Sequence, residues 1–204
     1  ELIQKVNPNK FTDVRFHYID QAEQNGLGHA ILEAEILINN EPFAVLLPDD
    51  LFFSEKSCLH QLLDVYEETK SSVIAVNKID KDNIHKYGVI KPGTKDSKKI
   101  LIDDIVEKPK AEEAPSDIAV CGRYIFNSSI FEQLKKVTFD NSGEIQLTDG
   151  IRNLLLHENV FACLYNGEKF DCGSKKGFVH ATISIALRDP SIGEDIKQLI
   201  REII

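Results

Sequence analysis

Short apolar segments alternate along this chain with segments whose apolar residues recur at helical spacing. Strands are expected where apolar and β-branched residues run together, at residues 14–19, 43–47, 72–76, 87–90, 99–106, 118–126 and 160–165. Helices are expected where apolar residues follow a spacing of three and four, at residues 26–38, 59–66, 145–156, 178–187 and 196–203. This alternation predicts an α/β protein with helices on the faces of a sheet.

Two of these segments support more specific expectations. Residues 43–47 are apolar throughout and lie between Pro42 and Pro48, which predicts a strand buried on both faces. Residues 178–187 are apolar almost all round, which predicts a buried helix. The final segment has one narrow apolar stripe, which would pack on the body of the protein or on a second subunit. The stripe consists of Ile196, Leu199, Ile200 and Ile203.

Composition and charge restrict the possible functions. The 204 residues are 42% hydrophobic, and no apolar run approaches the roughly 18 residues of a membrane span, which favours a cytoplasmic protein without a membrane partner. The net charge is −9, and no stripe of Lys and Arg with interleaved aromatic residues indicates nucleic-acid binding. Reduced thiols rather than a zinc site or disulfides are expected, because no C-x-x-C spacing occurs. The cysteines are Cys58, Cys121, Cys163 and Cys172.

Two aspartates more than a hundred positions apart each follow a short apolar strand. Asp49 follows Pro48, and Asp171 opens the sequence D-C-G-S-K. Open α/β sheets bind ligands beyond the carboxyl ends of their strands, and Mg²⁺ takes one or two carboxylates together with water and phosphate oxygens. Asp49 and Asp171 are therefore predicted to share Mg²⁺ beside a phosphate. Asp50 is the alternative to Asp49 as the ligand. The alternative role is turn formation for Asp49 and a helix-capping turn for Asp171.

Glycine and glutamine residues before the first predicted helix form another candidate site. Gly26 and Gly28 permit close backbone approach and leave N–H groups at the helix N-terminus for an anion or a base edge. Gln21 carries both a donor and an acceptor, which suit the edge of a pyrimidine. A polar loop before a helix is the alternative interpretation. His29, in the first turn of this helix, is given a structural role.

Charged residues at other strand and helix ends suit a sugar phosphate. Glu107 can accept hydrogen bonds from sugar hydroxyls, and Lys108 can meet a phosphate, unless the pair is only a charged strand edge. Lys175 lies near a helix start, four residues beyond Asp171, and is also placed to meet a phosphate. Thr148 and Asp149 are interpreted as helix-capping residues.

Seven motifs in this order resemble one family over essentially the whole chain, the bacterial UTP–glucose-1-phosphate uridylyltransferases. They are Q-A-E-Q-N-G-L-G-H-A at 21–30, L-L-P-D-D at 46–50, Y-G-V-I at 87–90, V-E-K-P at 106–109, C-G-R-Y at 121–124, G-E-I-Q-L-T-D at 143–149 and D-C-G-S-K at 171–175. The resemblance implies transfer from UTP to glucose 1-phosphate, giving UDP-glucose and pyrophosphate. It also implies a cytoplasmic homo-oligomer.

The resemblance implies a role for each candidate residue. Gln21 and Gly26 would contact uracil, and Asp49 and Asp171 would hold Mg²⁺. The glucose phosphate would be held by four residues, of which the two lysines also neutralise charge during the reaction. The four are Gly88, Glu107, Lys108 and Lys175.

The resemblance also implies the overall organisation of the chain. The expected fold is a Rossmann-like mixed sheet flanked by helices, of the nucleotide-diphospho-sugar transferase type. Within this single domain, residues 1–77 would be the nucleotide-binding half, 78–175 the sugar-phosphate-binding half and 176–204 the C-terminal helices.

The chain departs from this family at its N-terminal end. The family's G-x-G-T-R loop, followed by a lysine, has no counterpart here, and the chain has no methionine and begins at Glu1. We therefore expect an N-terminally truncated fragment with little activity alone, a processed complete protein being the alternative. Two other functions stay open: a sister enzyme that uses another base or sugar, such as dTTP, and a non-catalytic sugar-nucleotide-binding domain.

Overall fold

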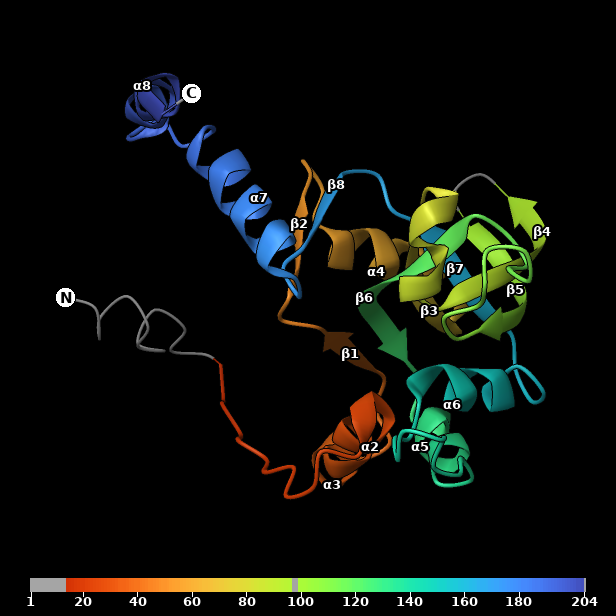
Figure 1. Cartoon of the computed structure of the whole chain (residues 1–204). Coiled ribbons are helices and arrows are strands. Elements are labelled where there is room, and N and C mark those ends of the chain that lie inside the picture. Colours follow the sequence, from red (N-terminus) through yellow and green to blue (C-terminus); the bar gives the residue numbers. More distant parts are fainter. Residues whose placement is uncertain (1–13, 97–98, 204) are drawn as a thin grey trace.

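A six-stranded mixed sheet forms the centre of the protein, whose computed structural model describes residues 14–96 and 99–203 (Figure 1). The strand order is β1–β6–β3–β7–β5–β4; β3 and β7 are parallel, and the other neighbours are antiparallel. The predicted α/β class with a mixed sheet is confirmed. The strands are β1 (Phe43–Leu46), β3 (Ser72–Lys78), β4 (Val89–Asp96), β5 (Lys99–Val106), β6 (Ile118–Phe126) and β7 (Val160–Leu164).

Helices cover both faces of this sheet. Val73 and Ala75 of β3 pack with α4 on one face, and Ile74 and Val76 face the core shared with α2, α5 and α6 on the other. Successive side chains of a strand point to opposite faces, so β3 contributes to both cores. The helices are α2 (Gly26–Glu33), α3 (Glu35–Ile38), α4 (Cys58–Thr69), α5 (Ser129–Leu134), α6 (Leu147–Leu154), α7 (Lys175–Ala186) and α8 (Gly193–Ile203), with the 3₁₀ helix η2 (Lys81–Lys86).

A separate ribbon of two short antiparallel strands lies beside the main sheet. β2 (Asp50–Phe53) pairs with β8 (Glu168–Asp171), and Asp50 lies opposite Asp171 in the register. The backbone N–H of Cys172 also donates to the carbonyl of Asp49 (2.8 Å). The ribbon therefore brings together two segments that are more than a hundred residues apart.

The expectation of a buried helix at 178–187 is wrong. α7 and α8 extend away from the six-stranded sheet (Figure 1), and α7 packs on β8, where His180 meets the ring of Phe170. Phe178 and Val179 are 60% and 53% exposed, and only Ala181 of this helix is buried. An apolar sequence leads to burial only where other elements cover the helix, and within residues 14–96 and 99–203 little covers this one.

Three other expectations need correction. Residues 14–19 form no strand, because they pair with no other described segment, and Tyr18 is 90% exposed. The helix expected at 26–38 is interrupted at Ala34 and divides into α2 and α3. β1 is not buried on both faces: among the described strands it pairs only with β6, and alternate side chains such as Leu46 are exposed.

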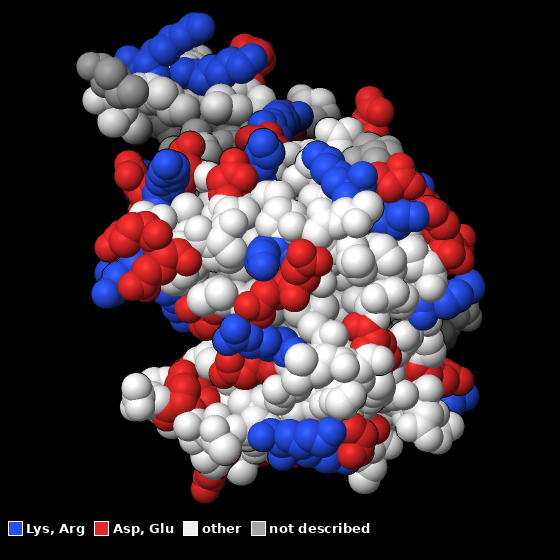
Figure 2. Space-filling view, turned by 90° about the vertical axis from the view of Figure 1, so that its right-hand side faces the viewer, with Lys and Arg blue, Asp and Glu red and all other residues white. Residues whose placement is uncertain are grey.

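The distribution of charge on the surface agrees with the absence of a Lys and Arg stripe from the sequence. On the face shown in Figure 2, Lys and Arg side chains are interspersed with Asp and Glu, without a broad area of one sign. No helix in the part of the chain that the structure describes combines the length and apolarity needed to cross a membrane.

Candidate active site

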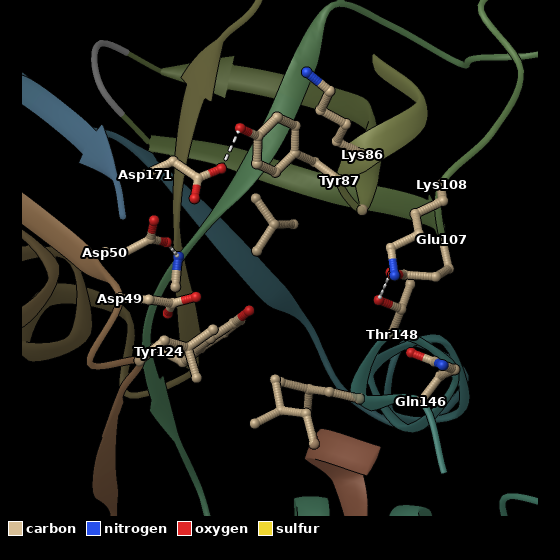
Figure 3. A pocket seen from close by; sticks show the side chains of 16 residues that line it. Asp49, Asp50, Lys86, Tyr87, Glu107, Lys108, Tyr124, Gln146, Thr148 and Asp171 are labelled. Carbon is tan, nitrogen blue, oxygen red and sulfur yellow. Dashed lines mark hydrogen bonds and ion pairs between the residues drawn. The ribbon is translucent and has the colours of Figure 1, made fainter. Parts of the chain in front are cut away.

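A polar cavity of about 330 Å³ lies where β1, β6, β8, the end of β5 and the start of α6 meet. Figure 3 shows aspartates on one wall, with Glu107, Lys108, Gln146 and Thr148 on the opposite wall. The cavity is lined by Leu27, Leu47, Asp49, Asp50, Lys86, Tyr87, Gly88, Glu107, Lys108, Val120, Gly122, Tyr124, Gln146, Leu147, Thr148 and Asp171. It therefore brings together five of the eight residues predicted for the site.

The two predicted metal ligands converge at one edge of this cavity. A Cβ built on Gly173 would lie 3.1 Å from Oδ2 of Asp49 and 3.2 Å from Oδ1 of Asp171, so both oxygens approach the same point. Glycine leaves that point open. The β2–β8 ribbon causes the convergence, because Asp49 immediately precedes β2 and Asp171 ends β8.

Asp50 differs from its neighbour in its surroundings. Its side chain is 10% exposed; Oδ1 lies 2.9 Å from Nζ of Lys169, and Oδ2 accepts a hydrogen bond from the N–H of Gly122 (2.8 Å). Asp49 is exposed at the cavity edge. Since the Asp50 carboxylate already has a cation and a backbone donor, the geometry favours Asp49 over Asp50 as a metal ligand.

Tyr87 adds a contact that the sequence analysis did not predict. Its hydroxyl donates to Oδ2 of Asp171 (2.8 Å), and its ring lies under Nζ of Lys169 at 4.9 Å. Burial, followed by this hydrogen bond, raises the pKa of Tyr87 above its usual value. The hydroxyl therefore remains a donor that fixes the Asp171 carboxylate, with Oδ1 turned toward Gly173.

The opposite wall is built around Glu107. Thr148 donates its hydroxyl to Oε2 of Glu107 (2.6 Å), so the interpretation of Thr148 as a cap is wrong, and α6 has no side-chain cap. Gly88 lies against this pair: a Cβ built on Gly88 would lie 3.2 Å from Oε2 of Glu107 and 3.3 Å from Oγ1 of Thr148. Lys108 is exposed, has a φ of 43°, and places Nζ 3.5 Å from Oε1 of Glu107.

Three predicted residues, Gln21, Gly26 and Lys175, do not line the cavity. Gln21 donates Nε2 to the carbonyl of Gly26 (3.1 Å) and contacts Nδ1 of His29 (3.0 Å), so it braces the start of α2. The N–H of Gly28 donates to the carbonyl of Ile145 (2.9 Å). The expectation that this N–H would be free to bind an anion is therefore wrong.

The third residue is Lys175, which begins α7, two residues beyond Gly173, and is exposed. Its helix is capped by Ser174, whose hydroxyl accepts from the N–H of Gly177 (3.0 Å). Lys175 is therefore an exposed residue of the first turn of α7, four residues beyond Asp171.

The carboxylates of Asp49 and Asp171 suit a divalent cation that takes few ligands from the protein. Within residues 14–96 and 99–203, no group of three or more His, Cys, Asp or Glu side chains is arranged to hold a metal ion. Asp49 and Asp171 alone supply two carboxylates on an open cavity edge. Two carboxylates fit Mg²⁺, which completes its shell with waters and substrate phosphates rather than with a protein cage.

Comparison with known proteins places the chain in a family. A family model described as nucleotidyl transferase matches residues 2–187. The chain belongs to the nucleotidyl transferase family. A relative from Staphylococcus epidermidis named UTP–glucose-1-phosphate uridylyltransferase is 43% identical over 204 residues, which are all of this chain and 70% of that protein. A protein of the same name from Staphylococcus haemolyticus is 42% identical over the same shares.

Solved structures of nucleotidyl transferases share the fold. A UDP-glucose pyrophosphorylase complexed with UDP-glucose matches with a TM-score of 0.82 and 39% identity, over 85% of this chain and 67% of that one. A UTP-bound UGPase from Acinetobacter baumannii matches with a TM-score of 0.82 and 31% identity, over all of this chain and 74% of that one. The family resemblance that the seven motifs indicated is confirmed.

Proposed function

We propose that this nucleotidyl transferase catalyses transfer of uridylate from UTP to glucose 1-phosphate, giving UDP-glucose and pyrophosphate. The observation that carries the proposal is the convergence of Asp49 and Asp171 on Gly173, opposite Glu107 and Lys108 in one cavity. The names of the Staphylococcus relatives and the UDP-glucose and UTP complexes of similar structures support the choice of substrates.

The reaction requires positioning and charge neutralisation rather than a protein base. The second pKa of a phosphate monoester is about 6, so near neutral pH an oxygen of glucose 1-phosphate can attack the α-phosphorus of UTP directly, with pyrophosphate leaving. Mg²⁺ held by Asp49 and Asp171 would supply positive charge to the crowded phosphates. Lys108 and Lys175 would add positive charge from either side. Alignment of two substrates can contribute roughly 7–11 kcal/mol to lowering such a barrier.

The walls of the cavity suggest where the sugar binds, and the start of α2 beside them suggests a place for the base. Glu107, fixed by Thr148, would accept hydrogen bonds from glucose hydroxyls, and Gly88 would let the sugar approach the backbone. Gln21 and Gly26 would meet uracil at the start of α2; the structure gives Oε1 of Gln21 no hydrogen bond from a described residue, which leaves an acceptor for the N–H of the base.

The organisation of the chain follows from this arrangement. Residues 1–77 would form the nucleotide-binding half, 78–175 the sugar-phosphate half and 176–204 the C-terminal helices. The exposed apolar residues of α7 and α8 suit contact with a second copy in a cytoplasmic homo-oligomer.

The proposal is tested by pyrophosphate release from UTP and glucose 1-phosphate, with and without Mg²⁺. The assay is run on the chain of residues 1–204. Asp49→Asn and Asp171→Asn should each lower Mg²⁺-dependent turnover at least tenfold with nearly unchanged melting temperatures. Asp195→Asn, an exposed position on α8, is the matched control and should retain turnover.

Three results would change the proposal. Faster turnover with dTTP than with UTP would indicate the sister enzyme with another base. Calorimetric binding of UDP-glucose without turnover would indicate a non-catalytic sugar-nucleotide-binding domain. Full activity in Asp49→Asn would remove that carboxylate from the cation site.

A further inference from the structure

Arg123 lies in the motif C-G-R-Y on β6 and has no role in the proposed chemistry. Its guanidinium group donates three hydrogen bonds to backbone carbonyls. Nη1 donates to the carbonyls of Leu47 (2.7 Å) and Gly122 (2.8 Å), and Nη2 donates to the carbonyl of Asp50 (2.7 Å). The side chain is half-buried, and its guanidinium stacks on the ring of Phe52 at 4.5 Å. Arg123 is therefore held at both its flat face and its edge.

The carbonyls of Leu47 and Asp50 are the two ends of the turn that carries Asp49. The N–H of Asp50 lies 3.4 Å from the carbonyl of Leu47, and Pro48 occupies the second position of this four-residue turn. That backbone bond is long, so it holds the turn weakly. Arg123 spans the turn instead, because one planar group bonds to both ends.

β6 also fixes where the turn sits. The N–H of Leu47 donates to the carbonyl of Gly122 (2.9 Å), and the N–H of Gly122 donates to the buried carboxylate of Asp50. A Cβ on Gly122 would lie 2.7 Å from both Oδ2 of Asp50 and Cβ of Leu47, so the turn rests directly on this strand. The position of Asp49 thus depends on two adjacent residues of β6.

We propose that Arg123 is a positioning residue, which holds the Leu47–Asp50 turn so that the Asp49 carboxylate faces Asp171. The inference rests on the proposed cation-binding role of Asp49. Only a planar, forked donor can bond both ends of the turn, whereas lysine offers a single ammonium group on a flexible stem. Without the guanidinium group, the exposed Asp49 side chain would sample positions away from Asp171.

The test measures Mn²⁺ binding by electron paramagnetic resonance of free Mn²⁺, in the presence of UDP-glucose and with a protein-free titration subtracted. Arg123→Lys should weaken Mn²⁺ binding at least tenfold. Arg188→Lys is the matched control. Arg188 also lies against an aromatic ring of β2, that of Phe53, but its side chain bonds to Glu168 and to no turn carbonyl. The Arg188→Lys variant should bind Mn²⁺ as tightly as the unchanged chain. Arg123→Gln keeps a planar donor for one carbonyl and replaces Arg123→Lys if that variant melts below the assay temperature.

A double substitution separates positioning from a general loss of structure. If Arg123 acts through Asp49, Arg123→Lys combined with Asp49→Asn should bind Mn²⁺ as weakly as Asp49→Asn alone, within twofold. A further tenfold loss in the double variant, or unchanged binding in Arg123→Lys, would overturn the inference. Unchanged binding in Asp49→Asn, or no binding by the unchanged chain, would instead overturn the proposed cation site.

Discussion

Replacing Lys169 by Met should destabilise the protein strongly, although the residue touches no expected substrate. Its Nζ lies 2.9 Å from Oδ1 of Asp50, and the side chains of the pair are 13% and 10% exposed. In Lys169→Met, the Asp50 carboxylate would stay buried with only the N–H of Gly122 as a partner. Removing one member of a buried ion pair typically costs about 3–5 kcal/mol, mostly because the other charge remains unpaired.

Because the Asp50 side chain keeps some exposure, water partly screens its charge, and we expect the free energy of unfolding to fall by about 3 kcal/mol. For a chain of this size, each kcal/mol lowers the melting temperature by about 2–4 °C, so we expect a decrease of about 6–12 °C. Loss of the contact between Lys169 and the Tyr87 ring adds to this decrease. Urea unfolding followed by circular dichroism should show a lower midpoint with an unchanged slope.

Two further variants decide whether the unpaired charge is the cause. Adding Asp50→Asn to Lys169→Met removes that charge and keeps an acceptor for the N–H of Gly122, so it should recover roughly half of the lost stability. Lys197→Met, in an exposed ion pair with Glu194 on α8, should have little effect. A loss below about 1 kcal/mol in Lys169→Met, or no recovery in the double variant, would refute the reasoning.

Three predictions concern Tyr87 and the cysteines. Tyr87→Phe removes the hydroxyl that orients Asp171 and should raise the Mg²⁺ concentration needed for half-maximal pyrophosphate release several-fold; an unchanged Mg²⁺ dependence would contradict that role. Burial raises the pKa of the Cys58 and Cys121 thiols to about 12. At pH 8, Ellman's reagent should therefore modify the partly exposed Cys172 well before either of them. Equal rates of modification would contradict this burial. Because these two thiols ionise more easily in the unfolded chain, the free energy of unfolding should also fall as the pH rises from about 9 toward about 12.

Local pattern was sufficient for the elements that form the centre of the sheet. The short apolar run of β3, rich in β-branched residues, predicted a strand, and the helical spacing of Leu59, Leu62 and Leu63 predicted α4. The β2–β8 ribbon was missed because each strand has four residues, charged ones included, and finds its partner far along the chain. Residues 14–19 have a strand-like composition but no partner among the described strands, and composition alone does not supply one.

The same distinction applies to the candidate site. Asp49 was predictable because it follows β1, whose end should face the ligand. Asp171 ends β8, a strand outside the six-stranded sheet that the sequence did not predict, so the motif D-C-G-S-K was the signal that pointed to it. Tyr87 and Thr148 were not predictable, since their roles come from hydrogen bonds to Asp171 and Glu107, which lie far away in sequence. The position of Tyr87 in the motif Y-G-V-I was the one signal that pointed to it.

The β2–β8 ribbon also affects when the site can form during folding. Its two strands close a loop of more than a hundred residues, and closing a loop of this length costs entropy that only later contacts offset. The two carboxylates therefore meet only once β2 and β8 have paired. A cation bound between them would stabilise only chains in which this pairing is complete.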